Sequence, residues 1–352
     1  MSAVRLESVA MVAPDGTRIL DDVSLEVAQG ELLVLVGPSG SGKTSVIRAV
    51  AGVDEISSGR VMFDDVDVTK VRIAERDVGM VFQSAALFPT HTVRNNISFP
   101  LRIRKVKEPT VRKRVAAEAR ALGLTEMIEH WPQQLSAGHQ QLVQIARAMV
   151  RVPQVLLLDE PLAHVDRPTR YRLRADLRQL QQGYGVTTLL ATNEPGEAMA
   201  LADRIAAIED GRIQQVGPPQ DVYAAPADTH IAWLTGPISF IDATVQPDTR
   251  GFWLTHGNFS LRAWAPVLSS HVGAKVRIGL RPDGVRMVPS SSTRAVVVGN
   301  SFDSGHPVTK VEIGSAIVSI EALNAPPDTD IGIRIDHFLV FGPDDKLIVA
   351  VS

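Results

Sequence analysis

The sequence contains no cysteine among its 352 residues, and aromatic residues make up only 5% of it. Without cysteine, neither a disulfide framework nor a thiolate metal site can form. No apolar stretch approaches the ~18 residues that a membrane-spanning helix needs. The N-terminal MSAVRLESVA also lacks the apolar core of a signal peptide. We therefore expect a protein of the cytoplasm.

A strong charge of one sign is also missing. The 36 lysines and arginines nearly balance the 39 aspartates and glutamates, so the net charge of −3 produces no general attraction to nucleic acid or to an anionic membrane. The basic stretch RIRKVKEPTVRKR at 102–114 has no aromatic side chains between its charges. We interpret it as a solvated helix face and expect no nucleic-acid partner. The length is sufficient for two domains with a substantial core.

The most informative stretch is LLVLVGPSGSGKT at 32–44, where an apolar run typical of a buried parallel strand stops at a glycine-rich loop. It matches the pattern G-x-x-x-x-G-K-[ST], a cradle for phosphate. Its glycines let successive N–H groups from about Gly40 to Thr44 point at one anion, and a helix that begins near Lys43 favours phosphate at its start. Lys43 would reach the β- and γ-phosphates, and the Thr44 hydroxyl would contact Mg²⁺. The predicted nucleotide-binding residues of this loop are Gly37, Pro38, Ser39, Gly40, Ser41, Gly42, Lys43 and Thr44.

Two further apolar runs end in polar side chains. The run VGMVF at 78–82 brings Gln83 to the carboxyl edge of the predicted sheet, where open α/β sheets bind their ligands. The run QVLLLDEP at 154–161 ends in Asp159 and Glu160. We expect Asp159 to hold Mg²⁺, directly or through water, and Glu160 to polarise an attacking water. Gln83 is a candidate both for catalysis and, with Thr44 and Asp159, for contact with the metal.

The stretch LSAGHQQLVQIARAMV at 135–150 predicts a helix capped by Ser136, with apolar residues at helical spacing. Such a start, with Gly138 permitting close approach, suits an anion, although a capped core helix has the same pattern. The segment LFPTHTVRNNI at 87–97 follows Gln83 and is either a partner contact or an ordinary connector.

In this order and spacing, the motifs resemble those of the ATP-binding cassette (ABC) ATPases, and among them the subunits that drive carbohydrate importers of the maltose and trehalose type. The resemblance covers essentially the whole chain and rests on GPSGSGKT, VFQSAALFP, LSAGH, LLLDEP and LAHVD, which contains Asp166. It implies that ATP and Mg²⁺ are the cofactors and that Asp166 belongs to the nucleotide site.

The family also implies the partners. Two copies would pair head to tail, so that ATP on Lys43 of one copy is closed over by Ser136 and Gly138 of the other. Gln83 and the segment after it would transmit this closure to transmembrane permease subunits, and an extracytoplasmic solute-binding protein would act indirectly. The chain would then lie at the cytoplasmic face of the membrane as a peripheral protein.

Three departures from the family pattern fall where the chemistry takes place. The signature usually reads LSGGQ, but here Ala137 and His139 replace a glycine and the glutamine. Asn193 stands in place of a histidine; its amide can donate a hydrogen bond to the γ-phosphate but cannot carry a proton. Ala13 occupies the position of the aromatic side chain that stacks on adenine, so we expect weaker nucleotide binding. With the lysine, the metal ligands and Glu160 retained, we predict an active but slow ATPase in which Asn193 also takes part.

The predicted fold class is α/β. Residues 1–236 are expected to form a P-loop cassette with a mixed sheet, a helical subdomain at about 84–150, and an antiparallel β-layer from two alternating segments at 4–27 joined by PDG. The helical stretch DTHIAWLTG at 228–236 is expected to dock on the cassette. Short alternating runs such as FWLTH, KVRIGL and FLVFG at 237–352 predict a small antiparallel barrel or sandwich. The stretch IGLRPDGVRMV at 278–288 resembles the oligonucleotide-fold (TOBE-like) accessory domain of these importers. We expect core or interface positions for Trp253 and Trp264.

Two other classes of function remain open. One is a nucleotide switch that binds ATP and dimerises but scarcely hydrolyses it, which Ala13, Ala137 and Asn193 favour and Glu160 opposes. The other is a soluble cassette protein acting on ribosomes or DNA, although the sequence has neither an internal repeat nor a long heptad run. The solute is a sugar by resemblance, with a polyamine, an anion or glycerol phosphate as alternatives.

Overall fold

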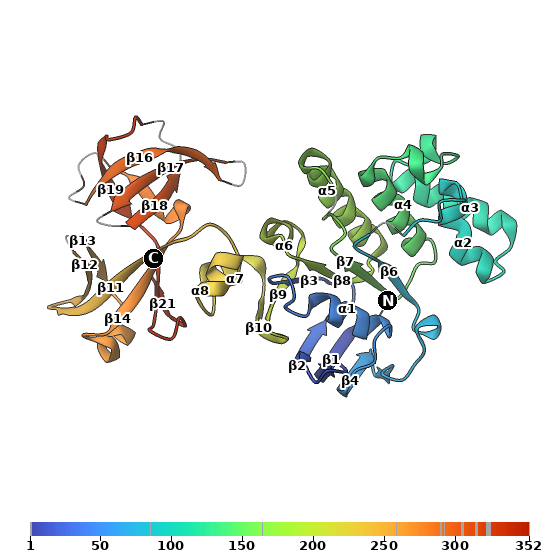
Figure 1. Ribbon diagram of the computed structural model, residues 1–352, viewed down its shortest axis with the longest axis horizontal. Coiled ribbons are helices and arrows are strands. Elements are labelled where there is room, and N and C mark those ends of the chain that lie inside the picture. The colour runs from blue at the N-terminus through green and yellow to red at the C-terminus, as the bar shows by residue number, and fades with distance from the viewer. Residues whose placement is uncertain are drawn as a thin grey trace. The chain divides into compact units, whose positions relative to one another are not determined.

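The computed structural model describes residues 2–351 except 85, 164, 258, 289–290, 292, 304–305, 314–315 and 322–324. Ala85 of VFQSAALFP and His164 of LAHVD therefore lie outside the described residues. The chain divides into two compact units, Met1–Pro219 and Gln220–Ser352. The first contains sheets and helices, and the second is dominated by strands (Figure 1).

The first unit begins with the predicted antiparallel β-layer, which is confirmed. Its strand order is β2-β1-β4-β5. The inward positions Val23, Leu25 and Val27 of the second strand are all buried, as their period-2 spacing predicts. The strands are β1 (Val4–Val12), β2 (Arg18–Val27), β4 (Ser58–Phe63) and β5 (Val66–Asp67).

A six-stranded sheet forms the centre of the first unit, in the order β10-β9-β3-β8-β7-β6. All neighbouring pairs are parallel except β10 with β9. The central strands β3, β7 and β8 are buried along their whole length, which explains their continuous apolar sequences. The strands are β3 (Leu32–Val36), β6 (Val78–Val81), β7 (Val155–Asp159), β8 (Thr187–Thr192), β9 (Arg204–Glu209) and β10 (Arg212–Gly217).

Helix α1 (Lys43–Ala51) fills the space between the two sheets. Val46, Ile47 and Val50 belong to one buried cluster with residues of both sheets. The helix ends at Gly52, whose φ of 74° is left-handed and suits glycine. Because α1 is anchored along its length, the loop that precedes it is held at the carboxyl end of β3.

The helices α2 (Val93–Ile103), α3 (Glu108–Ala121) and α4 (Ala137–Met149) lie in the range where the sequence predicts helices. The basic stretch 102–114 is mostly exposed, as predicted, and Arg104 pairs there with Asp77 at 3.3 Å. Two further helices, α5 (Arg167–Tyr184) and α6 (Pro195–Leu201), follow β7 and β8. Among the described residues, no helix is long and apolar enough to cross a membrane.

The second unit contains two antiparallel sheets around one core, as the alternating runs predict. Their strand orders are β13-β12-β11-β14-β20-β21 and β15-β19-β16-β17-β18. The strands are β11 (Ser239–Asp248), β12 (Gly251–His256), β13 (Phe259–Ala263), β14 (Lys275–Leu280), β15 (Val285–Met287), β16 (Arg294–Asp303), β17 (His306–Ile313), β18 (Ala316–Glu321), β19 (Asp330–Ile335), β20 (Phe338–Phe341) and β21 (Leu347–Val351).

The structure differs from three expectations for this part of the chain. The two compact units divide at 219/220, after the first residue of α7 (Pro219–Ala224) and ahead of α8 (Thr229–Leu234), whereas the sequence predicts a domain boundary at 236/237. The sequence predicts that α8 docks on the cassette, but Ala232 packs with Leu339 and Phe341 of the second unit because its apolar partners come from a later strand. A core position is wrong for Trp264, which is 58% exposed. The Arg262 guanidinium lies 4.3 Å from its ring, and this cation–π contact does not require burial.

Candidate nucleotide-binding site

The phosphate loop connects β3 to α1 and adopts a backbone that only glycine permits at several positions. A Cβ atom on Gly37 would clash with the carbonyl oxygen of Ile208 on the neighbouring strand β9. Gly40 and Gly42 have left-handed φ angles of 83° and 105°. Helix α1 has no capping side chain at its N-terminus. The predicted strand, loop and helix context is thus confirmed, and the first N–H groups of the uncapped helix are of the kind that binds an anion.

Lys43 is the main positive charge of this loop and is only 4% exposed. Its Nζ donates hydrogen bonds to the carbonyl oxygens of Gly37 and Pro38, at 2.9 and 2.8 Å. Burial lowers the pKa of Lys43, and the carboxylates of Glu160 and Asp159 act in the opposite direction. A desolvated ammonium bonded to neutral carbonyls is well suited to receive an anion, because buried charges are stabilised by pairing.

Other loop residues fit the same ligand. The Ser41 hydroxyl is buried and has no hydrogen-bond partner among the described residues. Pro38, Ser39, Gly40 and Thr44 are exposed. An unpaired buried hydroxyl beside a buried ammonium is an arrangement that phosphate oxygens would complete. The residues present therefore fit a nucleoside triphosphate.

The structure brings the predicted metal ligands together. Asp159 ends β7, and its Oδ1 accepts a hydrogen bond from the Thr44 hydroxyl at 3.0 Å. Burial raises the pKa of Asp159, whereas this hydrogen bond and the charge of Lys43 lower it. The described residues contain no cluster of three or more His, Asp or Glu side chains suited to a metal. One hydroxyl and one carboxylate fit Mg²⁺, which is usually completed by water and by phosphate oxygens.

Glu160 has a backbone that the sequence did not predict. Its φ is 43°, a left-handed conformation that costs a non-glycine residue about 1 to 3 kcal/mol and is concentrated at functional sites. Its N–H donates to the carbonyl oxygen of Ala191 on β8 at 2.9 Å. Its Oε2 accepts a hydrogen bond from Gln83 Nε2 at 3.1 Å. Two of the three predicted catalytic side chains, each in the loop after a different strand, therefore meet.

The remaining candidates occupy three other loops. Asn193 directly follows β8, which neighbours β7, and is exposed. Asp166 caps α5 by accepting a hydrogen bond from the Thr169 N–H at 3.2 Å. Ala13 lies partly buried in the turn between β1 and β2, where its N–H donates to the carbonyl oxygen of Thr17.

Ser136, Ala137, Gly138 and His139 lie at the start of α4, away in sequence from the phosphate loop. Ser136 is the predicted cap: its Oγ accepts from the His139 N–H at 3.3 Å and lies 2.8 Å from His139 Nδ1. Gly138 has a reason to be small that the sequence did not indicate. A Cβ there would lie 2.7 Å from Thr169 Cγ2 on α5, so the glycine permits two helices to pack.

Sequence reasoning missed two buried amides that hold the segment after Gln83. Gln144, in α4, is 1% exposed; it donates to the carbonyl oxygen of Phe82 at 2.8 Å and accepts from the Ala86 N–H at 2.9 Å. Asn96, in α2, is fully buried and accepts from the Phe88 N–H at 2.9 Å. Gln144 and Asn96 could both have been found in the sequence, because each is a polar residue on the buried side of a predicted helix.

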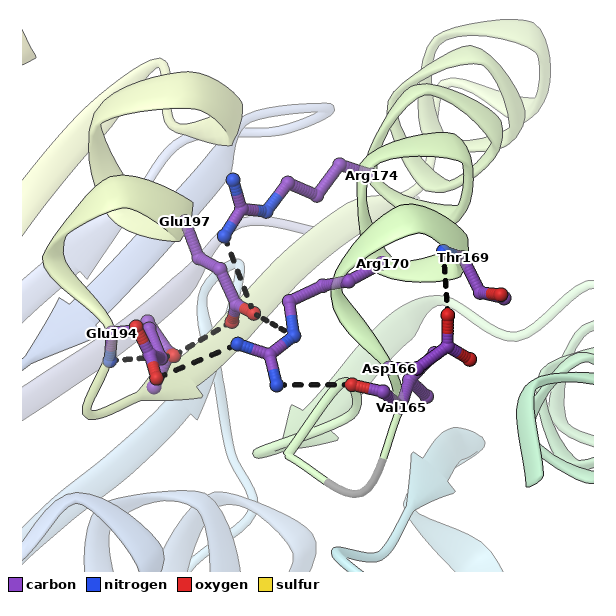
Figure 2. A network of polar contacts seen from close by, with 8 residues as sticks. Val165, Asp166, Thr169, Arg170, Arg174, Glu194 and Glu197 are labelled. Carbon is purple, nitrogen blue, oxygen red and sulfur yellow. Dashed lines mark hydrogen bonds and ion pairs between the residues drawn. The ribbon is translucent and has the colours of Figure 1, made fainter. Parts of the chain in front are cut away.

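Sequence reasoning also missed a group of arginines and glutamates around Asn193. Arg170 and Arg174 of α5 face Glu194 and Glu197, which flank the start of α6 (Figure 2). No sequence pattern pairs α5 with α6, because the two helices are separated by β8.

The fold and the phosphate loop define a P-loop nucleotide-binding protein. The family model described as ABC transporter matches residues 20–163. The chain is 42% identical to the trehalose/maltose import ATP-binding protein MalK of Thermococcus litoralis, over 84% of each chain. It is 36% identical to the sn-glycerol-3-phosphate import ATP-binding protein UgpC of Roseobacter denitrificans, over 99% of this chain and 94% of the relative.

A solved structure agrees. A dimeric ATP-binding cassette in a post-hydrolysis state, bound to ADP and Pi, matches 61% of this chain and 98% of its own with a TM-score of 0.56 and 30% identity. The chain belongs to the ABC transporter family, as an ATP-binding import protein with ATPase activity.

Proposed function

We propose that this chain hydrolyses ATP to drive uptake of a sugar through separate membrane subunits, working as a head-to-tail pair at the cytoplasmic face of the membrane. The observation that supports it most is the likeness to a trehalose/maltose import protein over 84% of both chains. The Lys43–Thr44–Asp159–Glu160 arrangement supports the hydrolytic part.

Each predicted site residue has a role in this proposal. Lys43 and the main-chain N–H groups from about Gly40 to Thr44 bind the β- and γ-phosphates, and Thr44 and Asp159, with Gln83, hold Mg²⁺. The metal would neutralise charge on the phosphates. Glu160 accepts a proton from the attacking water. Gln83 positions Glu160 through the hydrogen bond between them.

The other copy completes the site in this proposal. Ser136, Ala137, Gly138 and His139 of one copy would close over the nucleotide on the other, with Asp166 beside it. A helix start capped by Ser136 is a suitable partner for the γ-phosphate. The second unit would be the TOBE-like accessory domain, because its short antiparallel strands enclose one core.

Uptake of sn-glycerol 3-phosphate is the second candidate, because the relative that covers 99% of this chain imports that compound by its name. Tagged full-length chain, purified from detergent-extracted membranes, is expected to bring integral membrane subunits with it. The solute-binding protein of the same transporter is then added to the complex. Maltose or trehalose is expected to stimulate Mg-ATP hydrolysis by this assembly. Stimulation by sn-glycerol 3-phosphate or spermidine instead would refute the sugar assignment, and a chain that purifies without membrane subunits would refute the importer role.

Asn193 is expected to limit the rate of hydrolysis. Asn193→His should raise kcat, by as much as about 10²-fold if proton transfer is limiting, because an imidazole can carry the proton that an amide cannot. Asn193→Ala should lower kcat, since it removes the amide donor to the γ-phosphate. Steady-state ATPase assays of the assembled complex measure both. An unchanged kcat in Asn193→His would show that this position does not limit turnover.

A further inference from the structure

Arg170 lies in the first turns of α5 and contacts two separate segments of the chain (Figure 2). Its Nη2 donates a hydrogen bond to the carbonyl oxygen of Val165 at 3.0 Å. Its Nη1 lies 3.5 Å from Glu194 Oε1, and its Nε lies 3.9 Å from Glu197 Oε1. One guanidinium therefore joins the loop before α5 to the loop and helix after β8.

The exposed Asn193 lies in the sequence between Thr192 and Glu194, which belong to the same polar network as Arg170. Thr192, the residue before it, donates through its hydroxyl to Glu197 Oε2 at 2.7 Å. The same Thr192 Oγ1 accepts a hydrogen bond from the N–H of Glu194, the residue after it, at 3.1 Å. The Thr192 side chain thus links the backbone on both sides of Asn193 to Glu197, and Glu197 Oε1 lies 3.9 Å from Arg170 Nε and 3.7 Å from Arg174 Nη2.

Val165 is the residue directly before Asp166. Asp166 in turn caps α5 by accepting a hydrogen bond from the Thr169 N–H. The segment 165–169 is therefore held by two hydrogen bonds, one to the Val165 carbonyl oxygen and one to the Asp166 carboxylate. The Arg170 side chain is 18% exposed and that of Glu197 only 2%, which shields their contact from water. A movement at Asp166 would therefore be passed to the Asn193 loop through Arg170.

The charges explain why arginine is needed here. Burial raises the pKa of Glu197, whereas the hydrogen bond from Thr192 and the charges of Arg174 and Arg170 lower it. The planar guanidinium spreads five N–H donors over three nitrogens in a fixed fork, so that a different nitrogen faces the carbonyl and each of the two carboxylates, whereas the three donors of lysine share one nitrogen. Buried ion pairs of this kind contribute little net stability and more to a defined arrangement.

We propose that Arg170 is a positioning residue for ATP hydrolysis. It couples the position of Asn193 to the position of Asp166 in the same copy. The inference rests on the proposed function, in which Asn193 meets the γ-phosphate and Asp166 faces the paired copy. Arg170 itself does not touch the nucleotide; it links the contact between copies to the residue that senses the phosphate.

The test is a double-mutant cycle on ATP hydrolysis by the assembled complex. Arg170→Lys is expected to lower kcat about 10-fold and to leave KM for ATP and the affinity for nucleotide unchanged, because the phosphate loop is intact. Combined with Asn193→Ala, it should lower kcat no further than Asn193→Ala does alone, since both variants remove the same action. Arg172→Lys, an exposed arginine on the same helix, is the matched control and should leave kcat unchanged.

A second variant covers the case in which Arg170→Lys folds poorly. Glu194→Gln changes a half-exposed side chain and should lower kcat by a smaller factor, again without adding to Asn193→Ala. The inference is overturned if the effects of the folded variants on kcat multiply fully with that of Asn193→Ala, or if the folded variants lower nucleotide affinity instead of kcat. If the unmodified complex does not hydrolyse ATP, the proposed function itself fails; hydrolysis with multiplying effects overturns only the role of Arg170.

Discussion

Replacing Glu160 by glutamine is expected to lower the rate of ATP hydrolysis by about 10²- to 10⁴-fold, the contribution of a positioned general base. Glutamine has the same shape and its amide can still meet Gln83, whose Nε2 lies 3.1 Å from Glu160 Oε2. The left-handed backbone at this position would be retained. Only the ability to accept a proton is lost, so nucleotide binding should be unchanged. At about 1.4 kcal/mol for each factor of ten, the effect is about 2.7 to 5.4 kcal/mol in the activation free energy.

Phosphate release under saturating Mg-ATP measures this effect on the assembled complex. Glu126→Gln makes the same chemical change at an exposed position and serves as the matched control. If Glu160→Gln hydrolyses ATP as fast as the unmodified chain, Glu160 is not the base. If the unmodified chain and Glu160→Gln both hydrolyse ATP at the same very low rate, the protein is a nucleotide switch. This is the class of function that Ala13, Ala137 and Asn193 favour.

Replacing Lys43 by methionine is expected to weaken Mg-ATP binding by about 10²-fold or more. The substitution keeps the length of the side chain and removes its charge. Charge-assisted hydrogen bonds contribute about 1.5 to 3 kcal/mol each, so the loss of two phosphate contacts reaches this factor. The effect is large at this site because Lys43 is 4% exposed and water does not screen it.

Titration with a fluorescent ATP analogue measures the affinity, and thermal unfolding without nucleotide checks that the loop survives the loss of the Lys43 bonds to Gly37 and Pro38. Lys70→Met removes an exposed lysine from the same unit and should bind nucleotide normally. Unchanged affinity in a folded Lys43→Met protein would contradict the assignment of the loop as the phosphate site.

Local patterns were sufficient for much of the site. The glycines, Lys43 and Thr44 of the phosphate loop are contiguous in sequence, and the apolar strands that end in Gln83 and Asp159 are short and continuous. Ser136 was recognisable as a helix cap because a cap depends on only four residues. In each of these cases the physical cause, a backbone requirement or a hydrogen bond, acts within one turn or one strand.

Contacts between distant segments could not be predicted in this way. From the sequence, the small size of Gly138 was explained by close approach to an anion, and only the position of Thr169 on α5 showed that helix packing requires it. The exposure of Trp264 and the burial of Ala232 against Leu339 and Phe341 likewise depend on which strands are neighbours. The apolar character of a residue indicates that its burial is favourable in free energy. It does not indicate which surface will cover the residue.

The amino-acid sequence by itself determined the strand, loop and helix of the predicted phosphate site, because the residues of the loop are adjacent and their backbone is dictated by glycine. Only the tertiary structure decided that Gln83 meets Glu160 and that Arg170 joins the loops of Asp166 and Asn193. These side chains come from separate strands and helices. They meet because the order of strands in the parallel sheet places β6, β7 and β8 side by side, and that order is set by long-range packing.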